Sequence, residues 1–204
     1  MRHNRPLVTV LASMLFLGGC TTAPPRNPQD SCQIFEEKSD WYDAAQDSYE
    51  KWGVPVPVQL AIIYQESRFN EDAKPPRTKL LWVIPWKRPS SAYGYGQVLD
   101  GTWDRYRQAT GNGWADRDDF EDVVDFIGWY CANASRKLGI RKDDAYRQYL
   151  AYHEGITGYK RGTHRRKRWL LKVAKNVARR ADRYRAQLAR CEKNLNRGWS
   201  FWPF

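Results

Sequence analysis

Glu66 is the residue whose position in the sequence best suits it to acid–base chemistry. It lies near the end of a helix that the spacing of apolar residues predicts over residues 57–70. Ile62 and Ile63 precede it by four and three positions, so its carboxyl shares their apolar face. Burial and the negative end of the helix dipole both raise the pKa of such a carboxyl. A carboxylic acid that stays protonated near neutral pH can donate a proton to a glycosidic oxygen, although a Glu near a helix end is more often exposed and inert.

Two further segments carry residues that suit contact with a sugar. Residues 91–98 place Gly94 and Gly96 beside Gln97. Such glycines let the backbone approach a ligand closely, and the Gln97 amide can bond hydroxyl or acetamido groups. The second segment, residues 149–155, contains two tyrosines, a histidine and a glutamate.

These segments together resemble the soluble-type catalytic domain of the lytic transglycosylases, which belong to the lysozyme superfamily. The family pattern Glu-Ser-Arg-Phe is matched by residues 66–69. The pattern Ala-x-Gly-Leu-Met-Gln is matched in part by residues 92–97, and Ala-Tyr-Asn-x-Gly by residues 151–155. The three motifs occur in the family's order, and the resemblance covers roughly residues 55–190.

The resemblance implies an enzyme that cleaves the β-1,4 bond between N-acetylmuramic acid and N-acetylglucosamine in peptidoglycan strands. Glu66 would protonate the leaving oxygen and then accept a proton from the C6 hydroxyl, which attacks C1 and closes a 1,6-anhydro ring. By the same resemblance Ser67 would orient Glu66. Gln97 would bind the sugar, and Tyr152 would contact the Glu carboxyl from across the cleft. The glycines of residues 92–97 would shape the backbone near the sugar.

The sequence departs from the family pattern at Tyr95, Gly96 and His153, and it places a second carboxylate, Glu154, at the variable position after His153. Tyr95, where the family has Leu, would add an aromatic ring on which a sugar could stack. His153 replaces the family Asn, and because protonated His presents only donors, activity could depend on pH there. Glu154 is either a solvent-facing residue at a helix end or a second carboxylate in the cleft that positions a water. In the second case the protein would be a goose-type muramidase, which is a hydrolase on the same scaffold. A third alternative, a non-catalytic peptidoglycan-binding lipoprotein, is supported by His153 in place of the family Asn.

The N-terminus has the features of an export signal. Residues 1–19 combine a basic start with a short apolar run and a small-residue exit, which predicts a signal peptide. Residues 17–20, Leu-Gly-Gly-Cys, resemble the bacterial lipobox, so Cys20 is expected to be lipidated. Residues 20–31 would form a Pro-rich tether, and residues 32–204 the folded domain. The residue after Cys20 is Thr21 and not Asp, which resembles the pattern of lipoproteins that are sorted to the outer membrane. The folded domain is then expected in the periplasm.

The remaining cysteines predict one disulfide in this oxidising compartment. Cys131 falls on a helical stripe of apolar residues, which favours a buried thiol. Cys32 and Cys191 remain at the two ends of the domain. Their pairing would close nearly the whole domain, and the alternative is two free thiols.

The predicted fold class is mainly α: a goose-type lysozyme-like helical domain with a long Pro- and aromatic-rich loop and a basic C-terminal helix. The 204 residues are 42% hydrophobic, which fits one packed domain and excludes disorder throughout. Beyond the N-terminus no apolar run is long enough for an integral membrane bundle. Helical spacing predicts the following segments: 40–52, 57–70, 102–109, 118–138, 143–154 and 166–195.

The loop at residues 74–91 contains four prolines between Lys74 and Pro89, which forbid a long helix and leave room for a short strand. It could grip glycan, touch a membrane or pack on the core through apolar residues, which are Leu80, Leu81, Trp82, Ile84 and Trp86. The aromatic end, residues 199–204, could cap the core or enter a bilayer interface.

The net charge of +11 is concentrated near the C-terminus. Residues 160–190 hold 13 Lys and Arg and a single acid, Asp182. Such a face could attract an anionic membrane or polymer, or could simply be solvated. Nucleic acid is not an expected partner of an exported protein. No cofactor is expected, and no metal either, because position 157 is Thr where a zinc helix beginning at His153 would need His.

Overall fold

The computed structural model describes residues 23–77, 79–80, 84–85 and 89–195. The predicted signal peptide at 1–19, the lipidation site Cys20 and the aromatic end at 199–204 lie outside the described residues. So do the loop side chains that the sequence singled out, which are those of Leu80, Leu81, Trp82, Ile84 and Trp86.

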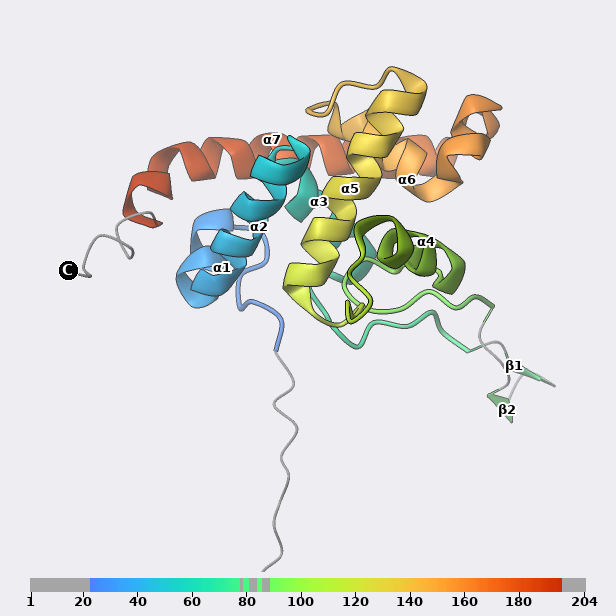
Figure 1. Ribbon diagram of the computed structural model, residues 1–204, viewed down its shortest axis with the longest axis horizontal. Coiled ribbons are helices and arrows are strands. Elements are labelled where there is room, and N and C mark those ends of the chain that lie inside the picture. Colours follow the sequence, from blue (N-terminus) through green and yellow to red (C-terminus); the bar gives the residue numbers. More distant parts are fainter. Residues whose placement is uncertain (1–22, 78, 81–83, 86–88, 196–204) are drawn as a thin grey trace, which may run out of the picture.

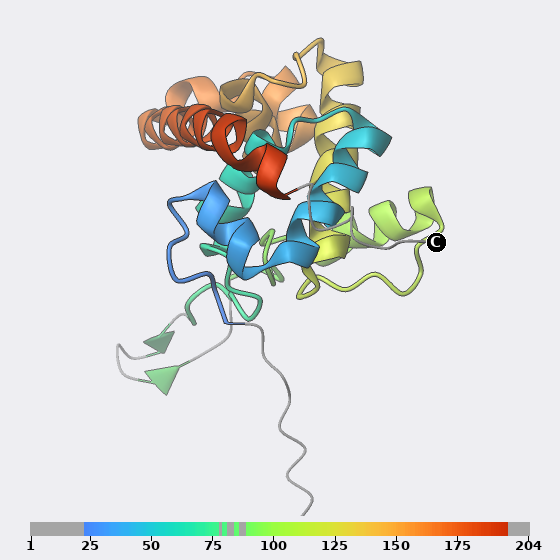
Figure 2. The ribbon, with the colours of Figure 1, turned by 90° about the vertical axis from the view of Figure 1, so that its left-hand side faces the viewer.

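The described chain is mainly helical, which confirms the predicted fold class. Its elements in order are α1 (Ser31–Glu37), α2 (Ser39–Trp52), α3 (Val56–Ser67), β1 (Lys79–Leu80), β2 (Ile84–Pro85), α4 (Asp100–Thr110), α5 (Phe120–Leu138), α6 (Ala145–Lys160), the 3₁₀ turn η1 (Thr163–Arg166) and α7 (Arg168–Leu195). Helix α7 extends across the width of the molecule behind the other helices (Figure 1). Strands β1 and β2 form an antiparallel hairpin that stands away from the helices (Figure 2).

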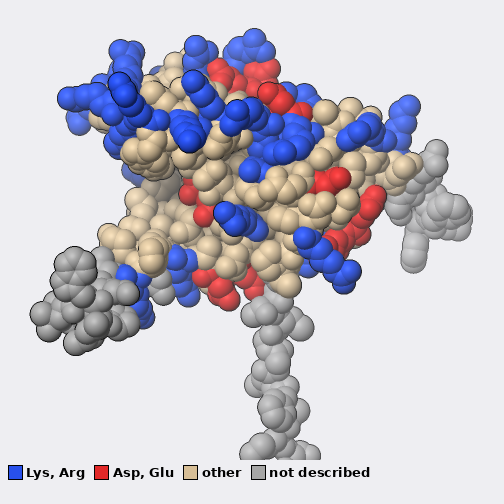
Figure 3. Space-filling view, turned by 180° about the vertical axis from the view of Figure 1, so that it is seen from behind, with Lys and Arg blue, Asp and Glu red and all other residues tan. Residues whose placement is uncertain are grey.

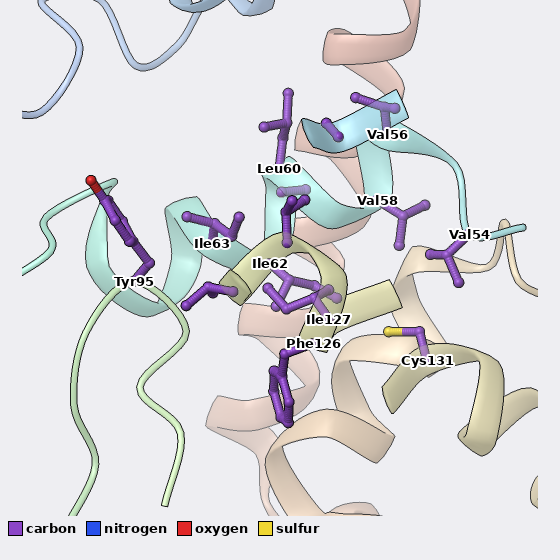
Figure 4. Packing of buried hydrophobic residues seen from close by; sticks show 14 of the residues in the cluster. Val54, Val56, Val58, Leu60, Ile62, Ile63, Tyr95, Phe126, Ile127 and Cys131 are labelled. Atoms are coloured by element: carbon purple, nitrogen blue, oxygen red, sulfur yellow. The ribbon is translucent and has the colours of Figure 1, made fainter. Parts of the chain in front are cut away.

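Helix α3 is the central element, because nearly all of its sides are apolar. Every residue from Val56 to Ile63 is buried, and a helix that is apolar all round belongs in a core. Figure 4 shows Ile62 and Ile63 of this helix close to Phe126 and Ile127 of α5. Helix α7 packs the apolar stripe of its amphipathic surface against α3 and α6 and leaves its basic residues outside. Among the described helices none is both long and apolar enough to cross a membrane.

The disulfide that the sequence predicts is confirmed. Cys32 in α1 is bonded to Cys191 in α7, with 6.0 Å between their Cα atoms. Cys131 is a buried free thiol, also as expected. The segment before α1 is bound to α7 as well, since the Tyr184 hydroxyl donates to the Pro28 carbonyl (2.5 Å) and Arg180 donates to Gln29 (2.7 Å).

The helix boundaries differ from the predicted ones at a few places. Helix α1 was not predicted, because it is only two turns long; the Asp30 side chain caps it by accepting from two backbone N–H groups. Helix α6 continues past Glu154 to Lys160 across a kink at Gly155, whose φ is 73°. Helix α5 ends as predicted at Gly139, a left-handed cap with φ 69°.

Candidate active site

Glu66 lies in the last turn of α3, where the chain makes a sharp exit from the helix. Arg68 and Phe69 both have positive φ, 56° and 64°, which is costly for residues other than glycine. The Phe69 side chain is fully buried against Trp41, at 5.8 Å between ring centroids, and this packing holds the strained turn. The turn ends the helix directly after the carboxyl and fixes where it lies.

The Glu66 carboxyl is sheltered from water. Its Oε1 atom is buried and has no hydrogen-bond partner within the described part of the chain. Burial raises the pKa of Glu66 to about 7, while a hydrogen bond from the Tyr149 side chain lowers it in part. A carboxyl with a pKa near neutrality can both donate and accept a proton.

Glu66 opens onto a groove of about 650 Å³. Glu66 and Ser67 line it from the end of α3, and Gln97 lines it from the loop before α4. The segment 70–76 contributes further walls, including Asp72 and Lys74. Figure 3 shows that the molecule is hollowed on the side where the basic upper part faces the part leading to β1 and β2. Three of the predicted site residues, Glu66, Ser67 and Gln97, therefore share one cavity.

The loop at residues 93–98 is shaped by its glycines. Gly94 has a φ of 74°, and an added Cβ would lie 1.8 Å from the Arg117 carbonyl oxygen, so only glycine fits. At Gly96 a Cβ would lie 3.0 Å from the Tyr152 hydroxyl. That hydroxyl donates to the Gly96 carbonyl at 2.7 Å and thereby joins α6 to the loop.

Gln97 has a structural task in this loop. Its Nε2 donates to the carbonyls of Ala73 (2.7 Å) and Gly94 (3.0 Å), which joins the two walls of the groove. Its backbone φ is 49°, another strained value at this site. The amide nitrogen of Gln97 is thus engaged by the protein, which leaves its amide oxygen as the atom for a ligand.

One of the expected roles, that of Tyr95, is corrected by the structure, and the expected orientation of Glu66 by Ser67 stays a prediction. The Tyr95 ring is 1% exposed and packs edge-on against Trp41 and Phe120, so it belongs to the core and no sugar can stack on it. The Ser67 hydroxyl donates to the Ile63 carbonyl (3.3 Å), as a serine at a helix end often does, and that bond does not orient Glu66.

Glu154 is neither solvent-facing nor a cleft carboxylate that positions a water. Its side chain is 3% exposed and accepts hydrogen bonds from Lys167 Nζ (2.6 Å) and from the Thr163 hydroxyl. It also contacts His153 Nδ1 at 3.1 Å. Despite desolvation, these bonds lower the pKa of Glu154 to about 2. Both of its oxygens are thus committed to holding α6, η1 and α7 together.

Tyr149 is the site residue that sequence reasoning missed. It is buried on α6, and it makes the side-chain hydrogen bond to Glu66 that was expected of Tyr152. Burial, and after it the nearby charge of Glu66, raises the pKa of the Tyr152 hydroxyl, but that hydroxyl is bonded to the loop. Tyr149 lies three positions before Tyr152, on the same face of the helix, and that spacing is the signal that could have found it.

Within the described residues, no group of three or more His, Cys, Asp or Glu side chains is arranged to hold a metal ion. Comparison with known proteins gave one finding. The model of the transglycosylase SLT domain family matches residues 8–191, which is most of the chain and includes the groove. No curated protein and no solved structure matches the chain.

Proposed function

The chain belongs to the transglycosylase SLT domain family, and we propose that Glu66 is the general acid and base with which it performs the peptidoglycan lytic transglycosylase reaction of that family. The observation that carries this assignment is the buried carboxyl with a raised pKa on the wall of a groove. A strongly shifted group in a cavity is a candidate for catalysis.

The proposed reaction uses one carboxyl twice. Protonated Glu66 donates its proton to the oxygen between C1 of N-acetylmuramic acid and the next sugar, and the C1–O bond breaks. The Glu66 carboxylate then accepts the proton of the C6 hydroxyl, whose oxygen bonds to C1 and closes a 1,6-anhydro ring. The proton balance is zero, and no water is consumed. A pKa of about 7 serves both steps, since neither protonation state is strongly favoured at neutral pH.

The main alternative outcome at this groove is hydrolysis. Glu154 is excluded from that role by its buried contacts, but Asp72 also lines the groove and could orient a water. In that case the products would carry reducing ends instead of 1,6-anhydro ends. The end group of the product therefore separates the two reactions.

Digestion of purified peptidoglycan sacculi, followed by mass analysis of the fragments, tests the proposal. We expect 1,6-anhydro ends from the wild-type protein and a loss of at least about 100-fold in rate for Glu66→Gln. Glu50→Gln, an exposed glutamate on α2, is the matched control and should keep full activity. Undiminished turnover by Glu66→Gln would remove Glu66 from the mechanism.

The folding of the Glu66→Gln variant can be checked at the same time. Burial raises the pKa of Glu66 from 4.5 to about 7, so the native state loses stability as the pH rises through this interval; the loss is small at pH 5 and complete at pH 8. Glutamine carries no charge at either pH. The variant should therefore melt at or above the wild-type temperature at pH 8, and a large drop would indicate a structural role instead.

We also propose that the protein is an exported lipoprotein held at the outer membrane through Cys20. The signal-like residues 1–19 and the lipobox support this, and the disulfide between Cys32 and Cys191 fits an oxidising compartment. Metabolic labelling with a fatty acid, followed by membrane fractionation, is the test. Label on the Cys20→Ala variant, or its retention in the outer membrane, would contradict this anchoring.

A further inference from the structure

We propose that the side chains of Trp169 and His153 form an aromatic platform that binds a sugar ring of the glycan strand, away from the linkage that is cleaved. The inference rests on the proposed function, because it takes the strand to lie in the groove beside Glu66. It gives the enzyme a second contact with its substrate, on α6 and α7 instead of on α3.

The two rings lie in contact at the surface. Trp169, the second residue of α7, is 57% exposed. Its ring centroid is 5.2 Å from that of His153 on α6, and the ring planes meet at 77°. The His153 ring lies 6.4 Å from that of Tyr149, whose side chain is bonded to Glu66. A continuous row of rings therefore leads from the catalytic carboxyl to the exposed indole.

The buried Glu154 side chain supports the platform. The buried Glu154 carboxylate binds His153 Nδ1 at 3.1 Å and Lys167 Nζ at 2.6 Å, and Lys167 is two residues before Trp169. The buried carboxylate thus holds the His153 ring directly and the start of α7 through Lys167, and the Trp169 ring contacts the held imidazole. A large apolar side chain that is exposed and also held in place is pre-organised for a partner, because little conformational entropy is lost when the partner binds.

The chemistry of the platform suits a pyranose ring. The C–H groups on one face of the sugar can stack on the indole, which offers a flat apolar surface. Because the ionised Glu154 carboxylate can only accept, His153 must donate from Nδ1, which leaves Nε2 of the neutral imidazole as an acceptor. That nitrogen can accept from a sugar hydroxyl or from the N–H of an acetamido group.

Trp114 provides a matched control for the tryptophan. It is 98% exposed on the loop between α4 and α5, and within the described chain no aromatic contact to its ring is found. Truncation of either tryptophan removes a similar apolar surface. Only Trp169 is placed on the row of rings that leads to Glu66.

The test is binding of sacculi in the inactive Glu66→Gln background, measured by co-sedimentation, so that no turnover is needed. We expect Trp169→Ala to weaken binding about 3- to 10-fold, the range for one aromatic contact, while Trp114→Ala leaves it unchanged. Trp169→Phe should restore most of the binding, because it keeps a flat ring. The loss should persist at 0.5 M salt, since stacking is not screened, whereas binding through the basic face of α7 is.

Each outcome decides the question. Equal binding by the Trp169→Ala and Trp114→Ala variants, no rescue by phenylalanine, or a loss that disappears in salt would overturn the platform. The melting temperature of each variant confirms that the fold is intact. Failure of the proposed function would be seen separately, as turnover by the Glu66→Gln protein, and would leave the binding result readable.

Discussion

Two opposing effects act on the pKa of the Glu66 carboxyl. Burial among the apolar side chains of α3 disfavours its charge, and the Tyr149 hydroxyl favours it. The first effect is larger, so the pKa rises to about 7 instead of falling. Tyr149 is therefore a positioning residue for the proposed reaction, because it bonds to the Glu66 carboxyl and lowers in part the pKa that burial raises.

Tyr149→Phe should move the pH profile of the enzyme without abolishing activity. Loss of a hydrogen bond worth about 1 kcal/mol raises the pKa of Glu66 by up to about one unit. The first step needs the protonated carboxyl, so the basic limb of kcat/KM, expected near pH 7, should shift to higher pH. The rate of sacculus digestion between pH 5 and 9 measures this.

A matched substitution on the same helix controls for packing. Tyr146→Phe removes a hydroxyl three positions earlier on α6, for which the described residues show no contact to Glu66. Its pH profile should coincide with that of the wild-type enzyme. An unchanged basic limb in Tyr149→Phe would show that the hydroxyl does not act on the carboxyl.

The difference between Tyr149 and Tyr95 shows what a sequence can and cannot reveal about single residues. Both tyrosines were visible in the segments that the sequence singled out, and the structure places Glu66 and Gln97, which the family resemblance pointed to, on one groove. Whether a ring faces a groove or the core depends on its neighbours from other elements. Tyr95 is buried by Trp41 of α2, and no local pattern around residue 95 contains that information.

Among the secondary-structure elements, the junction of α6 and α7 depends on an ion pair between a buried carboxylate and a partly exposed ammonium. The Glu154 side chain is 3% exposed and that of Lys167 is 41% exposed, and within the described residues Lys167 is the Lys or Arg at salt-bridge distance from Glu154. Such a pair adds little net stability compared with an apolar contact. Removing the Lys167 ammonium has a cost, however, because the buried carboxylate then keeps only the Thr163 hydroxyl and His153 as partners.

Lys167→Met should destabilise the protein by about 1 to 2 kcal/mol at pH 7, which is less than for a fully buried pair because Lys167 is partly exposed and Glu154 keeps its contact with Thr163. The pKa of Glu154 is lowered to about 2 in the native protein, so its contribution is present above pH 4.5 and is lost as the pH falls toward 2. In the variant the carboxyl can protonate, so the difference from wild type should shrink at pH 4. Urea denaturation at the two pH values measures both effects.

An exposed ion pair on α7 provides the comparison for the Glu154–Lys167 pair. Arg185 and Asp182 form a surface pair at 2.6 Å, and Arg185→Met should change stability by less than about 0.5 kcal/mol. If the two substitutions cost the same, the Glu154 carboxylate is not buried in solution. The sequence alone could place Glu154 on a helix, but it could not show that Lys167 would cover it, because the two residues are on different elements.

For the molecule as a whole, the fold is closed by the bond between Cys32 and Cys191, which are separated by 159 residues. A cross-link over so long a loop restricts the unfolded chain strongly and stabilises the native state by roughly 5 kcal/mol at most. The Cys32→Ser, Cys191→Ser double variant should lose several kcal/mol in urea denaturation. The free Cys131 is buried, so Cys131→Ala serves as the control for thiol loss, and a cost as large as that of the double variant would contradict the closing role.

At this scale the sequence predicted most of what the structure shows. The mainly helical class follows from periodicity, the end of α5 at Gly139 from its cap, and the favoured pairing of the outer cysteines from counting, whereas the lysozyme-like fold was implied by the motifs that resemble the family. The short α1 and the extension of α6 beyond Gly155 were missed. Both depend on packing against α7 and η1, and the local pattern of apolar residues does not contain information about those contacts.

The attachment of the leading segment to α7 determines how the domain would respond to tension. Pro28 and Gln29 are hydrogen-bonded to Tyr184, Arg180 and Gln187, and the disulfide follows three residues later. A pull on the amino-terminal end would therefore meet hydrogen bonds to α7 and one to α3, where Gln29 donates to the Tyr64 hydroxyl (2.6 Å), and then the covalent link from Cys32 to α7. If the domain is tethered to a membrane while it holds a cell-wall strand, the covalent path carries the mechanical load from the tether into α7, and within the described residues a single hydrogen bond joins the tether to the helix that carries Glu66.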